Sequence, residues 1–210
     1  MATLHEVTTP GPDGSLAIPE GWRQGRGAFG GMTIAAAIRA IEQRVADPRR
    51  KIRAVTAEIP GPTLPGLASF TVDILRSGNS VTVARAALAQ RGEVTTHVVA
   101  VLAATREVPD PPTWRELTAP ASPPWHTIAP LPTDGSFPEF ARHFEYRIVA
   151  GIPASGAAAQ TIGWVRPREP GEARDAAFVA ALVDAWWPAT MVRTKVPRPL
   201  ATIAYTLELV

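Results

Sequence analysis

The 210-residue sequence contains no cysteine. That absence excludes disulfide bonds, a cysteine nucleophile and metal sites built on thiolates. Histidine is scarce too, with four copies at His5, His97, His126 and His143. None of the four has the spacing of metal ligands or an acidic neighbour that suggests a catalytic dyad. We interpret the histidines as structural, and the sequence predicts no metal site.

Long apolar runs and strongly charged runs are also missing. No segment approaches the roughly 20 uninterrupted apolar residues of a membrane span, and residues 1–14 have neither the basic nor the apolar region of a signal peptide. The net charge is only +2, and no stretch interleaves basic and aromatic residues as nucleic-acid binding would require. We therefore expect a soluble cytoplasmic protein that binds neither membranes nor nucleic acids. No G-x-S-x-G, P-loop, G-x-G-x-x-G or H-E-x-x-H motif occurs.

The first organised unit is predicted over residues 22–106. Residues 1–21 are polar and rich in Pro and Gly, and predict a loosely held N-terminal arm that contains at most one short strand. A glycine-rich segment then leads into a helix in which apolar residues recur at helical spacing. The repeating positions are Ile34, Ile38, Ile41 and Val45. The alanines between them make most other faces apolar as well, so this helix should be buried on several sides.

Four strands follow, because the apolar period changes from 3.6 to 2. They are centred on residues 53–59, 68–74, 81–90 and 94–102, with turn signals at residues 77–80 and 91–92. Short turns require antiparallel neighbours. The pattern predicts an α+β unit in which a four-stranded meander, paired in sequence order, curls around the helix.

A second, similar unit is predicted over residues 140–210. It follows a linker at 107–139, which holds nine of the 22 prolines and has Trp114 and Trp125 as isolated anchors. Two strands near residues 144–148 and 162–164, a helix at about 172–190 and a strand at 201–210 repeat the first unit with an offset of about 142 residues. Three further strands have no counterpart. The second unit is therefore predicted to be incomplete, and its helix to need cover from further residues or another subunit.

Gly30 and Gly31 are candidate ligand-binding positions at the start of the first helix. A glycine pair there lets a ligand approach free backbone N–H groups, where the helix dipole favours an oxyanion. The alternative is that these glycines only permit a tight start to a buried helix.

Asp184 is the sharper candidate, because it lies on an otherwise apolar helix where a carboxylate is costly to bury unpaired. Ala180 and Ala181 beside it are predicted to leave room for a ligand. The alternative is an Asp paired with Arg193 or left in water. Thr202 and Thr206 are predicted to share one face of the last strand, opposite Ile203, Tyr205 and Leu207. Such threonines either hold a water or are ordinary strand formers.

Several segments together resemble the acyl-CoA thioesterase II (TesB-like) family. They are GRGAFGGMTIAAAIRAIEQ, the strand ending EIPGPTLPG, VDILRSGNSVTVARAALAQRGEV, LVDAWWPA and ATIAYTLEL. The F-G-G helix start and the L-R-x-G-N-S turn are fairly specific together. The resemblance implies a double-hotdog fold in which curved sheets wrap two helices, with the second hotdog incomplete here.

The resemblance also implies site residues. Asp184 and Thr202 match the family's catalytic Asp and Thr, which hold the attacking water with a Gln expected about seventy residues after the Asp, beyond this sequence. Gly30, Gly31, Phe29 and Asn79 match the oxyanion and substrate-binding motifs. Where the family often has Arg-Pro-Gly, this sequence has Gly61-Pro62-Thr63, so it departs from the family pattern at that substrate contact.

The implied activity is hydrolysis of acyl-CoA, with CoA entering only as part of the substrate and no other cofactor. A thioester is reactive enough that an oriented water, a carboxylate and N–H donors suffice. We also expect a homo-oligomer. Two alternatives remain: a non-hydrolytic acyl-CoA-binding or hydratase/dehydratase-like hotdog protein, and an inactive truncated chain.

Overall fold

The computed structural model describes the whole chain except residues 1, 107–108, 110–117, 136, 197 and 210. Trp114, one of the two predicted anchors of the linker, lies outside the described residues. The other, Trp125, is 38% exposed, and the guanidinium groups of Arg166 and Arg147 lie 4.2 and 4.7 Å from its ring centroid. Among the described residues, no helix is long and apolar enough to cross a membrane.

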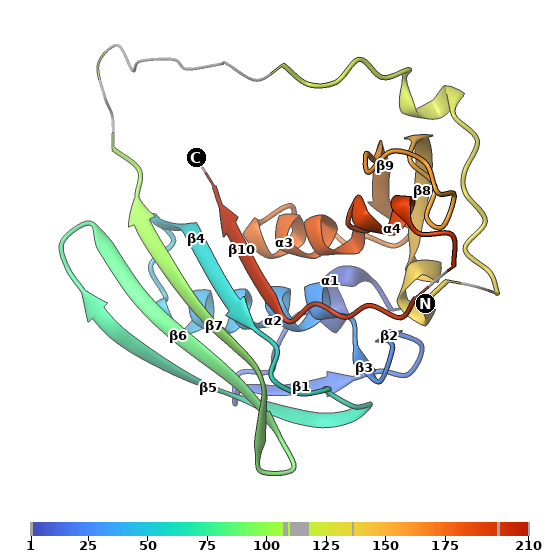
Figure 1. Cartoon of the computed structure of the whole chain (residues 1–210). Coiled ribbons are helices and arrows are strands. Elements are labelled where there is room, and N and C mark those ends of the chain that lie inside the picture. Colours follow the sequence, from blue (N-terminus) through green and yellow to red (C-terminus); the bar gives the residue numbers. More distant parts are fainter. Residues whose placement is uncertain (1, 107–108, 110–117, 136, 197, 210) are drawn as a thin grey trace.

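A six-stranded antiparallel sheet forms the body of the molecule (Figure 1). In spatial order its strands are β1 (Ser15–Ile18), β5 (Gly66–Ser77), β6 (Val81–Gln90), β7 (Glu93–Ala104), β4 (Arg50–Glu58) and β10 (Ala204–Glu208). Two two-stranded antiparallel sheets accompany it: β2 (Arg23–Gln24) with β3 (Gly27–Ala28), and β8 (Phe144–Ala150) with β9 (Ile162–Pro167).

The predicted strand order is wrong at one position, because β4 pairs with β7 and not with β5. The turns after β5 and β6 are short enough for hairpins. The connection from β4 to β5, residues 59–65, carries three prolines. Proline lacks the N–H of a strand ladder and favours an irregular connection. This segment therefore crosses the end of the sheet and leaves β4 free to close against the last strand of the meander.

The predicted first helix is confirmed as α2 (Gly30–Val45), against which the sheet curls (Figure 1). Every residue from Gly30 to Ile41 is buried, as expected for a helix that is apolar on most faces. The inner face of the sheet supplies Val55, Leu88, Val98 and Leu102 to the same core. The helix ends at Ala46, which adopts a left-handed conformation with φ of 52°.

The sequence predicted a loosely held N-terminal arm, and this prediction is wrong, because the arm packs on the core. It forms α1 (Leu4–Val7), which Thr3 and Glu6 cap reciprocally, and then β1, which pairs with β5. Leu4 and Leu16 are each only 2% exposed. Apolar residues in segments of four are too few to show a period, and this is why the sequence pattern missed the arm's contribution to the core.

The predicted helix at 172–190 is shorter in the structure and divided in two. Its main part is α3 (Ala176–Ala185), which Asp175 caps at the N-terminus. Trp186, the C-cap, is extended and ends the helix two residues before Pro188, which could not donate a helical N–H. A separate turn, α4 (Thr190–Arg193), follows.

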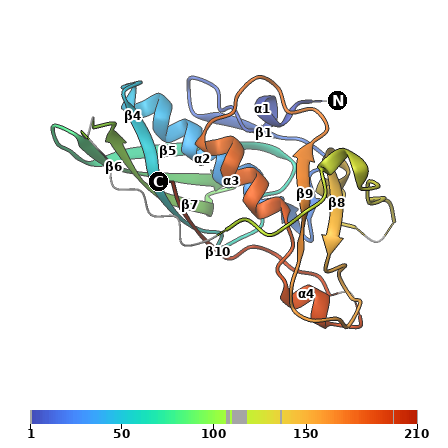
Figure 2. The ribbon, with the colours of Figure 1, turned by 90° about the horizontal axis from the view of Figure 1, so that it is seen from above.

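Strand β10 joins the two halves of the chain. It pairs with β4 and not with β8 or β9, so residues near the C-terminus extend the sheet formed by the first half. Helix α3 packs beside α2, as the views in Figures 1 and 2 agree. The incompleteness of the second unit and the boundaries of the units and the linker remain predictions.

The packing of α2 predicts a large effect for a change at its centre. Ile38 is fully buried, and Ile38→Ala should lower the free energy of unfolding by about 2–5 kcal/mol, because it removes transfer energy and leaves a cavity. The matched control is Leu67→Ala, since Leu67 is 72% exposed and its truncation should change stability by no more than about 0.5 kcal/mol. Urea denaturation measures both, and equal effects would contradict the placement of the core.

Candidate functional site

Asp184 and Thr202 meet where α3 ends and β10 is about to begin. The Thr202 hydroxyl donates a hydrogen bond of 2.7 Å to Oδ1 of Asp184. The predicted strand phase is wrong here. Tyr205 and Leu207 pack on the core, Ile203 and Ala204 are both exposed, and Thr206 is exposed as well. The alternation breaks between Ile203 and Ala204, and this break turns Thr202 inward toward α3 while Thr206 faces out.

Gly30 and Gly31 lie directly against this pair. A Cβ added to Gly30 would lie 3.0 Å from Oδ2 of Asp184 and 3.1 Å from Cβ of Thr202, and one added to Gly31 would lie 3.0 Å from Cβ of Asp184. An added Cβ would also meet Ile59 at 2.9 Å from Gly30 and the Phe29 ring at 2.5 Å from Gly31, so close packing around the helix start, including the approach of Asp184, requires glycine at both positions. No side chain caps this end of α2. The first N–H groups of a helix have no intrahelical partner, so they can stabilise negative charge.

The Asp184 carboxyl group is difficult to ionise. Burial raises its pKa above the ordinary value of 3.8, while the Thr202 hydrogen bond and the facing N–H of Gly31 act in the opposite direction. Oδ2 has no hydrogen-bond partner among the described residues. The alternative of an ion pair with Arg193 is not found in the described part of the chain. A carboxylate with one anchored and one unpartnered oxygen can accept a proton from a small ligand.

The two alanines predicted to leave room beside Asp184 lie in the helix–helix contact. Ala180 and Ala181 are fully buried, as are Ala35 and Ala36 on α2, where exposure is at most 1%. Small side chains here allow close packing of the two helices.

Two tyrosines that sequence reasoning missed also surround Asp184. The Tyr146 hydroxyl donates to the carbonyl of Ala185 (3.1 Å), and the Tyr205 hydroxyl donates to that of Ala180 (3.3 Å). Burial raises the pKa of both phenols, and the Asp184 charge raises both further. Tyr146 lies in the strand predicted near residues 144–148, but no sequence signal connected either tyrosine with α3.

Phe29, one of the predicted substrate-binding residues, is part of the core. Its ring is fully buried and stacks on Phe140 at 4.2 Å between centroids, with Phe144 edge-on at 5.8 Å. Phe29 is the N-cap residue of α2, so its packing fixes the start of that helix in the core.

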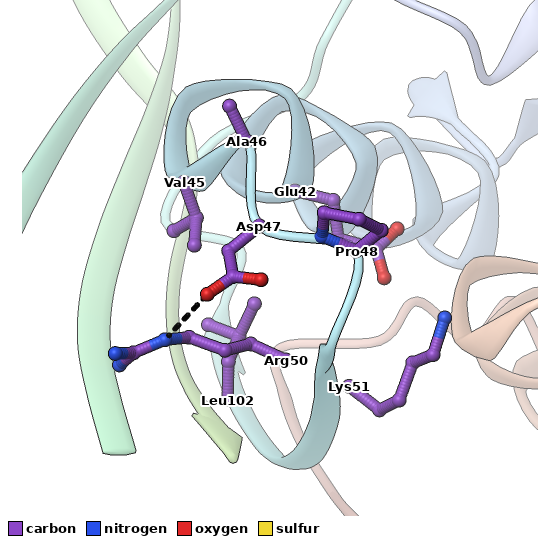
Figure 3. A pocket seen from close by; sticks show the side chains of 8 residues that line it. All are labelled: Glu42, Val45, Ala46, Asp47, Pro48, Arg50, Lys51 and Leu102. Atoms are coloured by element: carbon purple, nitrogen blue, oxygen red, sulfur yellow. Dashed lines mark hydrogen bonds and ion pairs between the residues drawn. The ribbon is translucent and has the colours of Figure 1, made fainter. Parts of the chain in front are cut away.

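The structure does not bring Asn79 to Asp184. Asn79 is exposed in the turn between β5 and β6, where its carbonyl accepts a hydrogen bond from Arg50. Arg50 also pairs with Asp47 at 3.2 Å and lines a cavity of about 330 Å³ beyond the C-terminal end of α2 (Figure 3). That end is a whole helix away from Gly30. In the described residues, this cavity and Asn79 are therefore separate from the Asp184 cluster.

None of the histidines pairs with Asp184 in the described residues. His143, the nearest in sequence, stacks on Trp22 at 4.0 Å and hydrogen-bonds the carbonyl of Gly21 at 2.9 Å. An Asp–His pair of the kind a hydratase uses is thus not formed there. No group of three or more His, Asp or Glu side chains suited to a metal ion occurs in the described part of the chain.

Two family profiles match this sequence in succession. Residues 18–107 match the acyl-CoA thioesterase N-terminal domain, and residues 109–210 match the acyl-CoA thioesterase C-terminal domain. The chain belongs to the acyl-CoA thioesterase family. The family assignment predicted from the sequence motifs is therefore confirmed. No curated protein matches the sequence significantly.

Solved structures confirm the hotdog fold for this thioesterase-family chain. A protein of unknown function with a hot dog fold from Alicyclobacillus acidocaldarius superposes with a TM-score of 0.85 at 24% identity, over 98% of this chain and 77% of that one. A candidate thioesterase II from Thermobifida fusca gives 0.76 at 21% identity, over 100% and 82%. An acyl-CoA thioesterase II from Mycobacterium marinum gives 0.54 at 23% identity, over 76% and 58%.

Burial of Asp184 predicts an observable titration. Its pKa should lie above 3.8, and Thr202→Val should raise it further, because that change removes a hydrogen bond to the charged form. The ¹³C shift of the carboxyl carbon against pH measures both values. A wild-type pKa at or below 3.8, or a fall in Thr202→Val, would contradict the described environment.

The same shift links Asp184 to stability. A raised pKa in the folded state means that the contribution of Asp184 to stability is fully present below the unfolded value of 3.8 and is lost as pH rises through the folded value. Asp184→Asn removes this dependence. The free energy of unfolding of the variant should therefore improve relative to wild type as pH rises from about 4 to about 7. Urea denaturation at several pH values tests this, and a constant difference would refute it.

Proposed function

We propose that this protein hydrolyses acyl-CoA thioesters to a free acid and CoA with a water held by Asp184 and Thr202. The observation that carries this proposal is the half-buried carboxylate with one oxygen fixed by Thr202 and the other unpartnered, facing the uncapped first turn of α2. Family membership supports the reaction class and the acyl-CoA substrate.

Each group has a defined role in this proposal. Asp184, ionised above its raised pKa, accepts a proton from water through Oδ2 as the water oxygen attacks the thioester carbonyl carbon. The Thr202 hydroxyl keeps the carboxylate oriented through Oδ1. The backbone N–H of Gly30, at the uncapped start of α2, stabilises the tetrahedral oxyanion, while the N–H of Gly31 faces the Asp184 carboxylate. The C–S bond then breaks, the sulfur of CoA leaves as a thiolate that takes up a proton, and the acid is released.

Kinetics of variants test the assignment. Asp184→Asn should lower kcat by about 10²–10⁴-fold, because the amide cannot accept the proton of the water. Thr202→Val should cost roughly tenfold, the magnitude of a hydrogen bond to a charged group. Release of CoA from a panel of acyl-CoA substrates, followed with a thiol reagent, measures both.

A matched carboxylate elsewhere provides the control. Asp73 is exposed on β5 and paired with Arg85 at 2.9 Å, so Asp73→Asn should keep wild-type turnover. Wild-type hydrolysis by a folded Asp184→Asn variant would refute the role of Asp184. Hydration of crotonyl-CoA without CoA release would favour the hydratase-like alternative, and binding without turnover would favour a non-hydrolytic protein.

A further inference from the structure

A buried arginine on α2 is unexplained by the proposed chemistry. Arg39 is only 6% exposed, nine residues after Gly30. A buried charge is costly unless it is paired and hydrogen-bonded. Its guanidinium group makes two parallel hydrogen bonds of 3.2 Å to the carboxylate of Asp175, through Nε and Nη2.

The remaining donor of Arg39 binds the N-terminal arm. Nη1 donates to the carbonyl of His5 at 2.9 Å and also contacts the hydroxyls of Thr8 and Thr9. The arginine is therefore held in place from the α1 side as well as from α3. The contacts with the N-terminal arm hold the Arg39 side chain independently of its contact with α3.

Asp175 has two functions at once. The carboxylate that receives Arg39 also caps α3, because Oδ1 accepts a 2.8 Å hydrogen bond from the N–H of Phe178. The position of this carboxylate therefore fixes where α3 begins. A shift of α3 along its axis would have to break either the cap or the ion pair.

The two contacts between the helices are in register. Nine residues separate Gly30 from Arg39 on α2, and nine separate Asp175 from Asp184 on α3. The helices run antiparallel side by side (Figure 2), so the Arg39–Asp175 pair lies about 14 Å from the Gly30–Asp184 contact on both helices. Between these two points both helices bury alanines. Small side chains allow close approach but give few interlocking ridges that would fix an axial position.

We propose that the Arg39–Asp175 ion pair is a positioning pair that sets the axial register of α3 on α2 and thereby holds Asp184 against Gly31. Its effect on turnover rests on the proposed hydrolysis, whereas its effect on the position of Asp184 does not. Loss of the pair should move Asp184 away from the N–H of Gly31 while leaving Thr202 attached.

Two variants separate this positioning role from the capping of α3 by Asp175 and from the positive charge of Arg39. Asp175→Asn keeps a good N-cap residue and removes the ion pair. Arg39→Lys keeps the charge and loses the bidentate geometry. Each should lower kcat for acyl-CoA hydrolysis by about 10–100-fold with KM changed less than threefold, since a displacement of about 1 Å is enough for such a loss. Ile38→Ala, which removes buried volume from the same helix without touching the pair, controls for lost stability and should keep wild-type kcat below its unfolding temperature.

The pKa of Asp184, read from its ¹³C carboxyl shift, provides a test that does not need activity. Removing the negative charge of Asp175 acts by electrostatics alone to lower that pKa. Losing the N–H of Gly31 acts to raise it. The positioning role therefore predicts a higher pKa in both variants.

The outcomes are separable. An unchanged or lower pKa of Asp184 in folded Asp175→Asn and Arg39→Lys would overturn the positioning role, as would wild-type kcat in both. If the wild-type protein hydrolyses no acyl-CoA but the pKa rises in both variants, the positioning role holds and the proposed function fails.

Discussion

The absence of two Cβ atoms, at Gly30 and Gly31, allows the rest of the site to form. Any larger residue would meet the side chain of Asp184 at about 3.0 Å. With glycine there, the last turn of α3 lies against the first turn of α2, and a carboxylate reaches the positive end of a helix that no side chain caps. The six-stranded sheet buries that helix and adds β10 at its edge, next to the segment that carries Thr202.

Burial of Asp184 has opposite effects on the stability of the folded protein and on the proposed chemistry. It raises the pKa of Asp184 and so makes the folded protein less stable as the group ionises. The same raised pKa brings a carboxylate closer to the range in which it accepts a proton efficiently. Thr202, the N–H of Gly31 and the tyrosine contacts with the α3 carbonyls keep the group in place despite that cost. A carboxylate whose pKa is shifted by burial is typical of functional sites.

Local patterns in the sequence predicted α2 and its strands, because those elements are long and strongly periodic. The contacts that assemble the site were harder to predict from the sequence. The neighbour of β4 depended on a proline-rich connection, and the inward turn of Thr202 depended on a break in alternation after Ile203. Arg39 and Asp175 are 136 residues apart, so no local pattern connects them. Asp184 was singled out as a carboxylate on an apolar helix, and the family resemblance then matched it and Thr202 to catalytic positions, but only the structure gives their hydrogen bond.

The most direct test of the central claim is a single-turnover reaction with an acyl-CoA in H₂¹⁸O, analysed by mass spectrometry of both products and protein. Direct attack by a water held at Asp184 places one ¹⁸O atom in the released acid and none in the protein. Unlabelled acid with ¹⁸O in the Asp184 carboxylate would show that the aspartate itself attacks the thioester and that the resulting anhydride is opened at the aspartyl carbon. That result would contradict the role of Asp184 as a base acting on water.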